Sequence, residues 1–127
     1  MFIIIGNENY EDYLKAIYLI SKHNKGGWAS NSEISDLLGI NPSSVSGMLH
    51  QLKKNDFISW KPRSSIRLTQ KGKIIAKQII RNYQKLEDFF KYILKIKDKQ
   101  LIDKLCCGIE HHITSEIIKA LDDLLIK

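Results

Sequence analysis

The chain has 127 residues, of which 43% are hydrophobic and 27% are charged, and its formal net charge at pH 7 is +6. This length fits one compact domain or two small lobes, and it argues against a large enzyme scaffold. No apolar run approaches the roughly 18 residues of a membrane span, and the first residues lack the basic flank of a signal peptide. We therefore expect a cytoplasmic protein with no membrane partner. The two cysteines, Cys106 and Cys107, are adjacent, so no disulfide framework is expected.

The spacing of apolar residues predicts three helices in the first half of the chain. The first is expected to end near His23, ahead of a glycine-containing break at residues 24–27. A short helix follows over residues 32–38 and ends at a glycine, and a third helix over residues 43–55 opens with the sequence Pro-Ser-Ser. Two short helices joined by a tight turn have the form of a helix-turn-helix.

A small hairpin is predicted after the third helix. Residues 57–60 and 66–69 have the composition of strands, and residues 61–65 between them have that of a turn. The hairpin would be the wing of a winged helix-turn-helix.

Three helices are predicted in the remainder of the chain. The first begins at Thr69 or Gln70 and continues to Leu94, and the others cover residues 98–111 and 114–126. The long helix carries more large apolar residues than one small lobe can cover, which predicts burial against other helices or against a second copy of the chain. The expected fold is therefore mainly α, with a winged helix-turn-helix followed by a helical lobe.

The positive charge is concentrated in one segment. Residues 50–85 contain ten lysines and arginines and one acidic residue, Asp56, so this segment carries +9 while the rest of the chain carries −3. Such a segment repels itself unless it faces solvent or a polyanion, and neutralisation of phosphate is its common use. The alternative interpretation is a solvated lysine-rich face.

In a helix-turn-helix, the second helix enters the major groove of DNA and nearby basic residues contact phosphate. Residues expected to meet bases or to allow close approach of the backbone are Ser43, Ser44, Ser46, Gly47, His50 and Gln51. Basic residues expected to attract phosphate are Lys53, Lys54, Lys61, Arg63 and Arg67. Any one of these residues alone has a simpler explanation as a helix cap or a solvated side chain. Together with the turn and the hairpin, they favour binding to double-stranded DNA.

A second group of residues is typical of a metal site. Cys107, Glu110 and His111 are spaced i, i+3 and i+4, which places a thiol, a carboxylate and an imidazole on one face of a helix. Each has a structural alternative: a small core residue, a solvated charge and a cation at a helix end, respectively. Cys106 is expected to pack in the core. Asp12, on the first predicted helix, is a candidate fourth ligand if that helix crosses the motif.

These motifs together resemble the diphtheria toxin repressor family of metal-dependent transcriptional repressors. The matching stretches are 11–18, 32–34, 42–48, 68–72 and 107–112. The short length resembles the manganese transport regulator branch of the family, which lacks a C-terminal SH3-like domain.

The resemblance implies a winged-helix DNA-binding domain in residues 1–72 and a helical dimerisation and metal-binding domain in residues 73–127, with no room for a third domain. It further implies a homodimer that binds a palindromic operator and represses metal-homeostasis genes when a divalent ion binds between the two domains. Such a protein is not an enzyme.

Carried over by position, Asp12, Cys107, Glu110 and His111 match one complete metal site of the family. Carboxylates suit Mn²⁺ and Fe²⁺, whereas a thiolate favours Fe²⁺, Co²⁺, Ni²⁺ or Zn²⁺. The mixture favours Fe²⁺ or Mn²⁺ as co-repressor and leaves Zn²⁺, Co²⁺ and Ni²⁺ open.

The second metal site of the family is not matched. Lys15 and Tyr83 stand where the family has ligands, and Asp103 stands where the iron branch has a histidine, which leaves Glu87 as the chief match. We hypothesise that the Lys15 ammonium supplies the positive charge of the missing ion, so that one regulatory ion binds per subunit.

Two other functions stay open at this stage. One is a metal-independent winged-helix regulator in which Cys107, Glu110 and His111 only pack or cap a helix. The other is a small zinc hydrolase with Glu110 as general base. The hydrolase needs an open metal position and a substrate cleft, and the sequence near the motif offers no spare oxyanion-stabilising group and no glycine-rich loop.

Overall fold

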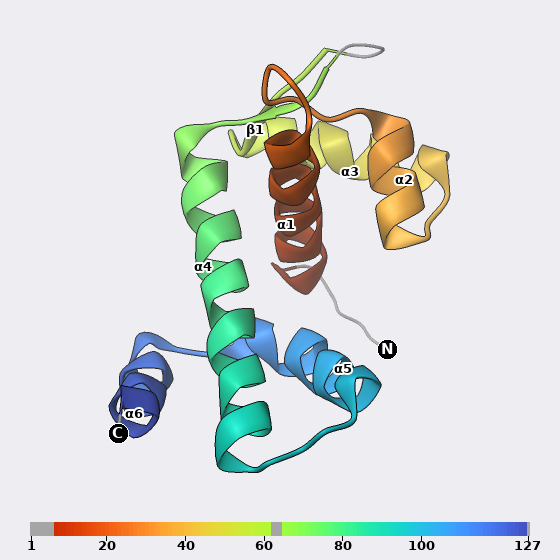
Figure 1. Cartoon of the computed structure of the whole chain (residues 1–127). Coiled ribbons are helices and arrows are strands. Elements are labelled where there is room, and N and C mark those ends of the chain that lie inside the picture. The colour runs from red at the N-terminus through yellow and green to blue at the C-terminus, as the bar shows by residue number, and fades with distance from the viewer. Residues whose placement is uncertain (1–6, 62–64, 127) are drawn as a thin grey trace. The chain divides into compact units, whose positions relative to one another are not determined.

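The computed structural model describes residues 7–61 and 65–126 of the chain, and these fold mainly into helices (Figure 1). The chain divides into two compact units, residues 1–77 and 78–127. Within the described residues, no helix is both long enough and apolar enough to cross a membrane. The mainly α fold predicted from the sequence is confirmed. Its elements are α1 (Asn7–His23), α2 (Asn31–Leu38), α3 (Pro42–Lys54), β1 (Ile58–Ser59), β2 (Arg67–Leu68), α4 (Gln70–Asp88), a π-helical turn (Phe89–Ile93), α5 (Lys99–Ile109), a 3₁₀ turn (Glu110–His112) and α6 (Ser115–Ile126).

Local capping fixes the ends of α2 and α3. Ser30 and Glu33 form a capping box at the start of α2, in which the Ser30 hydroxyl accepts from the Glu33 amide and the Glu33 carboxylate accepts from the Ser30 amide at 3.0 Å. Gly39 ends the helix at φ +67°, a conformation that costs glycine little. Asn41 then caps α3 by accepting from the Ser43 amide at 3.0 Å. These caps set the tight turn of the helix-turn-helix.

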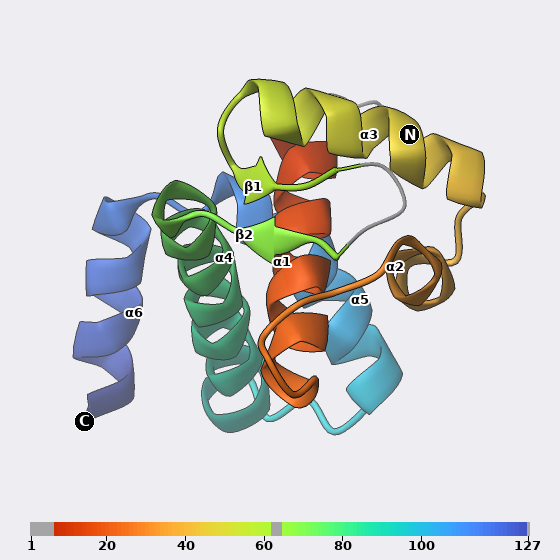
Figure 2. The ribbon, with the colours of Figure 1, turned by 90° about the horizontal axis from the view of Figure 1, so that it is seen from above.

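The two short strands form an antiparallel hairpin in which Ile58 pairs with Leu68 and Ser59 with Arg67. Figure 2 shows them side by side, with α3 next to β1. The backbones of Ala29 and Ile66 exchange two hydrogen bonds of 2.9 Å, so the loop before α2 is joined to the returning arm of the hairpin. The strands are shorter than predicted, and residues 62–64 of the expected turn lie outside the described residues.

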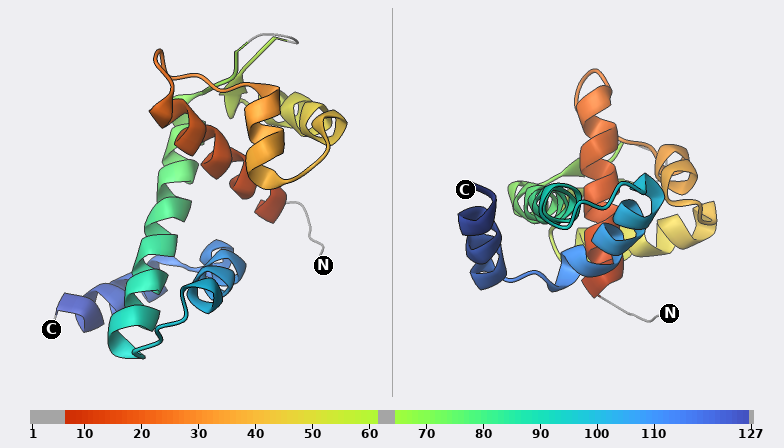
Figure 3. Two further views of the ribbon diagram at one scale, coloured as in Figure 1. Left: turned by 45° about the vertical axis from the view of Figure 1, so that its right-hand side comes forward. Right: turned by 60° about the horizontal axis from the view of Figure 1, so that its bottom comes forward.

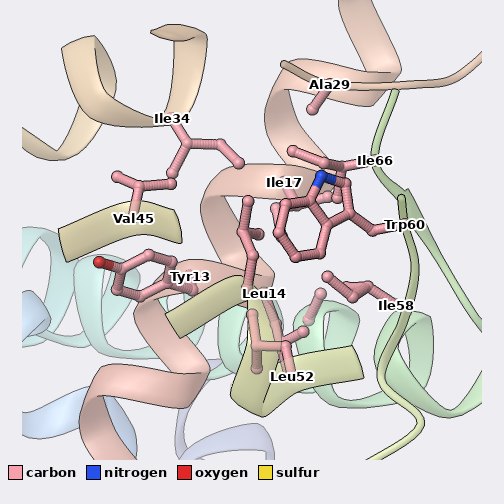
Figure 4. Close-up of a cluster of buried hydrophobic side chains, with 12 residues drawn as sticks. Tyr13, Leu14, Ile17, Ala29, Ile34, Val45, Leu52, Ile58, Trp60 and Ile66 are labelled. Atoms are coloured by element: carbon pink, nitrogen blue, oxygen red, sulfur yellow. The ribbon is translucent and has the colours of Figure 1, made fainter. Parts of the chain in front are cut away.

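The core of the first unit is built from one side of each helix and from the hairpin. Its fully buried side chains include Leu14 and Ile17 of α1, Ile34 of α2, and Leu49 of α3. The hairpin adds Ile58, Trp60 and Ile66, and the start of α4 adds Ala76. Figure 4 shows the α1 side chains surrounded by those of the other elements. This packing holds α3 against α1 and the wing.

The second unit has its own small core. Leu86, Ile102, Cys106 and Leu121 are buried there, one or two from each of α4, α5 and α6. The C-terminal part of α4 lies between α5 and α6 (Figures 1 and 3). Lys85 forms an ion pair with Asp122, which adds a polar contact between α4 and α6.

Two helix ends differ from the sequence prediction by two residues or more. The α-helix expected to reach Leu94 ends at Asp88, because a π-helical turn follows in which the Leu94 amide bonds to the Phe89 carbonyl at 3.1 Å. The wider turn accommodates two adjacent aromatic rings, Phe89 and Phe90, which meet edge to face at 5.6 Å and both pack on the core. The helix expected to reach His111 ends at Ile109, where the chain tightens into the 3₁₀ turn.

We predict that Gly72→Ala destabilises the protein by about 1–3 kcal/mol, the usual cost of overpacking. Gly72 lies in the first turn of α4, and an added Cβ would lie far inside van der Waals contact with the Phe57 carbonyl oxygen. Urea denaturation measures the free energy of unfolding. Gly47→Ala in α3 is the matched control, because nothing lies within 4 Å of its added Cβ and the helix should be unchanged or stabilised. Equal effects of the two substitutions would contradict this account of the packing.

Candidate functional site

A buried carboxylate and a buried imidazole lie together at the end of α5. The Glu110 side chain is 1% exposed and the His111 side chain 4%, and His111 Nε2 lies 3.6 Å from Glu110 Oε1. The interpretation of Glu110 as a solvated charge is therefore wrong. A buried carboxylate is costly unless a cation or donors compensate it, so its surroundings favour a positive partner.

The backbone at this point is fixed by a third buried residue. Asn82 of α4 is 3% exposed, and its side-chain amide donates to the Glu110 carbonyl at 3.0 Å. The α-helix ends at Ile109, and Glu110, His111 and His112 form a 3₁₀ turn with three residues per turn. The predicted regular helix therefore ends before Glu110, and the shared face of Cys107, Glu110 and His111 stays a prediction. Asn82 was not identified from the sequence, since nothing there distinguishes it from a solvated amide.

The two adjacent cysteines have opposite environments. Cys106 is fully buried in the core of the second unit, as predicted, whereas Cys107 is exposed and is not a core residue. Burial, with smaller contributions from the charge of Glu87 and neighbouring groups, raises the pKa of the Cys106 thiol to about 11. The Cys107 thiol donates to Asp103 Oδ1 across 3.7 Å. The i, i+4 spacing of Asp103 and Cys107 was the available sequence signal for this contact.

The residues at the unmatched second site have roles of their own. The Tyr83 hydroxyl donates to Asp103 Oδ1. Burial, and then the hydrogen bond to Asp103 and nearby negative charges, raise the pKa of Tyr83, so it stays a donor at neutral pH. Tyr83, Glu87 and Asp103 line an open pocket of about 700 Å³ in the second unit, together with Lys91, Tyr92, Lys95, Ile96, Lys97, Lys99 and Ile102.

The remaining predicted ligand and charge partner lie in the first unit. Asp12 and Lys15 are half-buried residues of α1, on either side of the buried pair Tyr13 and Leu14. Their roles toward the motif of the second unit stay predictions. The donor set available to an ion at the Glu110–His111 pair is thus a carboxylate and an imidazole, with a thiol close by in sequence. This chemistry fits a divalent transition ion.

The predicted DNA-contacting residues of α3 are mostly exposed. Ser43, Ser44, Gly47, His50 and Gln51 face solvent. Ser46 is half-buried instead, and its hydroxyl accepts from the Asn31 amide at 2.9 Å, so it ties α3 to α2. The His50 ring meets the Trp60 ring edge to face at 4.8 Å, which orients His50 toward the wing.

The predicted basic residues gather where α3 ends and the hairpin begins. Lys53, Lys54, Lys61 and Arg67 are exposed, and Arg63 lies outside the described residues. An open pocket of about 520 Å³ is lined by Lys53, Asp56, Ile58, Ser59, Trp60, Lys61, Ser65, Arg67 and Thr69. Ser59 and Ser65 were missed from the sequence, although their alternation with buried strand residues was a signal. A basic hollow with hydroxyl groups can hold a phosphate.

Arg67 is also held by the protein itself. Its guanidinium donates to the carbonyl oxygens of Gly26 and Gly27 in the loop after α1. Both glycines have positive φ, which places these carbonyls within reach. Arg67 therefore links the wing to that loop while remaining exposed.

Comparison with known families gives two matches that together cover most of the chain. Residues 7–66 match the family described as iron dependent repressor, N-terminal DNA binding domain. Residues 69–127 match the iron dependent repressor, metal binding and dimerisation domain.

Individual relatives agree with these matches. The chain is 36% identical over 115 residues to the HTH-type transcriptional regulator MntR of Shouchella clausii, covering 91% of this chain and 78% of the relative. Among solved structures, T. acidophilum IdeR has a TM-score of 0.77 at 26% identity over 99% of this chain, and the manganese regulator SloR has a TM-score of 0.76 at 27% identity over 96%. The chain spans 56% and 54% of those two solved chains, just over half of each.

We predict that a thiol reagent such as iodoacetamide modifies Cys107 of the native chain and spares Cys106. Cys106 is buried, and at pH 8 its raised pKa lowers the thiolate fraction roughly 100-fold relative to an ordinary thiol. Mass spectrometry of peptides after timed alkylation measures the two rates. In urea both cysteines should react alike. Equal rates in the native protein would contradict the assigned burial.

Proposed function

Because the chain belongs to the family of iron-dependent repressors, we propose that it is a homodimeric transcriptional repressor controlled by Fe²⁺ or Mn²⁺. The observation that supports this most directly is the buried Glu110 carboxylate beside the His111 imidazole. A buried acid next to a metal-binding side chain fits a cation site better than it fits a packing role.

The proposed ligands are Asp12, Cys107, Glu110 and His111. Glu110 and His111 are already adjacent, and Cys107 precedes them on α5. Asp12 is included because the sequence around it resembles the family at that position. The bound ion supplies positive charge. Fe²⁺ and Mn²⁺ suit the carboxylates, and the thiol leaves Zn²⁺, Co²⁺ and Ni²⁺ as further candidates.

Control of DNA binding follows from charge. Asp12, Glu110 and a Cys107 thiolate repel one another unless a cation lies among them. The arrangement that gathers these groups is therefore favoured only when the cation is present. That arrangement would also space the two α3 helices of a dimer for a palindromic site. The gain in operator affinity is then limited to the difference in the ion's affinity for the two arrangements.

The DNA-binding part of the proposal rests on the exposed face of α3 and on the basic hollow beside it. Ser43, Ser44, Gly47, His50 and Gln51 would face the major groove, and the half-buried Ser46 would mainly hold α3 in place. Lys53, Lys54, Lys61, Arg63 and Arg67 would attract phosphate. This role requires no catalysis, and it places the protein with the DNA, in the cytoplasm.

We predict that Fe²⁺ or Mn²⁺ strengthens binding to DNA roughly 5–150-fold over chelator, the usual range of allosteric coupling. The DNA is a palindromic duplex selected from a random library with the wild-type protein and Mn²⁺, and affinity is measured by fluorescence anisotropy at fixed salt. His111→Ala should abolish the metal effect. His112→Ala, which alters an exposed neighbour, should keep it. Equal affinity with metal and with chelator in the wild type would instead support a metal-independent regulator.

We also predict that Lys61→Gln makes the salt dependence of DNA binding less steep. The magnitude of the slope of log association constant against log salt concentration should fall by about 1, because one phosphate contact is lost. Lys119→Gln is the control, since Lys119 is an exposed lysine of α6 outside the basic segment. Gln51→Ala should leave the salt slope unchanged and relax sequence preference by about 1–3 kcal/mol at one position. Identical slopes for the wild type and Lys61→Gln would remove Lys61 from the interface.

A further inference from the structure

One carboxylate oxygen in the second unit accepts two hydrogen bonds. Asp103 Oδ1 accepts from the Tyr83 hydroxyl of α4 and from the Cys107 thiol, whose sulfur lies 3.7 Å away. Asp103 and Cys107 are one turn apart on α5. The side chain of a proposed metal ligand is therefore engaged by an acidic residue that the metal motif does not contain.

The position of this carboxylate is set by its neighbours. Tyr83 packs against the buried cluster of Leu86, Ile102 and Cys106, so its hydroxyl is presented from a fixed ring. Asp103 directly follows the buried Ile102, which anchors that turn of α5. The start of α5 is fixed as well, because the Asp98 side chain accepts from two backbone amides.

The direction of the thiol follows from this contact. Side chains on a helix lean toward its N-terminus, and the Cys107 thiol reaches back to Asp103 in that direction. Glu110 and His111 follow Cys107 on the C-terminal side. To bind an ion held by Glu110 and His111, the Cys107 thiol has to leave the Asp103 oxygen and release its proton to water, while Tyr83 remains as donor to Asp103.

We propose that Asp103 is a positioning residue that competes with the metal for Cys107 and so sets the preference of the site between thiophilic ions and Mn²⁺. The inference rests on the proposed metal-dependent function and gives it a determinant of ion selectivity. Asp103 acts here through the sulfur and is not itself a ligand.

The hydrogen bond from Cys107 to Asp103 lowers the affinity of some ions more than that of others. Co²⁺ and Zn²⁺ gain more from a thiolate than Mn²⁺ does, because Mn²⁺ prefers oxygen ligands. The negative charge of Asp103 attracts every divalent ion to a similar degree. The ratio of Co²⁺ to Mn²⁺ affinity therefore cancels the direct attraction of this charge for the ion and reports on the interaction of Asp103 with the sulfur.

The test measures both affinities in the full chain by competition with a chelator. Asp103→Ala should raise the ratio of Co²⁺ to Mn²⁺ affinity about fivefold, the value of one modest hydrogen bond. The sulfur-to-cobalt charge-transfer absorption should increase at the same time. Asp103→Asn keeps an acceptor oxygen without the charge and should give a smaller rise, because charge-assisted hydrogen bonds are stronger. It also serves if the alanine variant does not fold. Asp123→Ala, an exposed carboxylate of α6, should leave the ratio unchanged.

A double substitution identifies the route of the effect. With Cys107→Ala already present, Asp103→Ala should no longer change the ratio. A ratio that is unchanged or lower in Asp103→Ala, or a rise that persists without Cys107, overturns the inference. If the wild type shows no metal-dependent DNA binding, the proposed function fails and the inference fails with it. If the wild type responds to metal but Asp103→Ala keeps its selectivity, only the inference fails.

Discussion

The buried carboxylate of Glu110 is the constraint on which the chemistry of the second unit depends. A negative charge with 1% exposure requires compensation, and the His111 imidazole lies 3.6 Å from this carboxylate. Asn82 fixes the backbone from which this side chain projects, and Glu110 opens the 3₁₀ turn that follows α5. The small core of Leu86, Ile102, Cys106 and Leu121 supports all of these residues. The site is therefore built from rigid elements, which is what selective binding of an ion needs.

In the first unit, the packed helices and hairpin hold exposed polar and basic side chains in fixed positions. The capping box of α2, the left-handed Gly39 and the Asn41 cap define the turn between the two short helices. Val45, Leu49 and Leu52 then hold α3 by one side, which leaves the other side to solvent. The charge of the neighbouring wing and helix end is consistent with a phosphate-facing surface, since lysines placed this closely repel one another without an anion.

Sequence reasoning succeeded where local chemistry decides the structure. Gly39 and Pro42 marked the helix-turn-helix because a left-handed C-cap and a proline at the first helical position have few alternatives. It failed where tertiary packing decides. Apolar spacing alone does not distinguish the π-helical turn at Phe89–Ile93 from α-helix, and the i+3 and i+4 rule assumed a regular helix through Glu110. The proposed metal ligands stand out by residue type, whereas the contact of Cys107 with Asp103 depends on which rotamer the surroundings allow.

The two hydrogen bonds between Ala29 and Ile66 join the segment that leads into α2 to the returning arm of the wing. Arg67 adds a second tie, from the wing to the loop after α1. The returning arm of the wing is thus anchored to two segments of the first unit. These ties and the shared core hold α3 and the described arms of the wing together, so the spacing between the proposed base contacts and the proposed phosphate contacts is set when the chain folds. An ion that changes DNA affinity then has to act on the placement of the first unit as a whole. Such a change alters all of the proposed DNA contacts together.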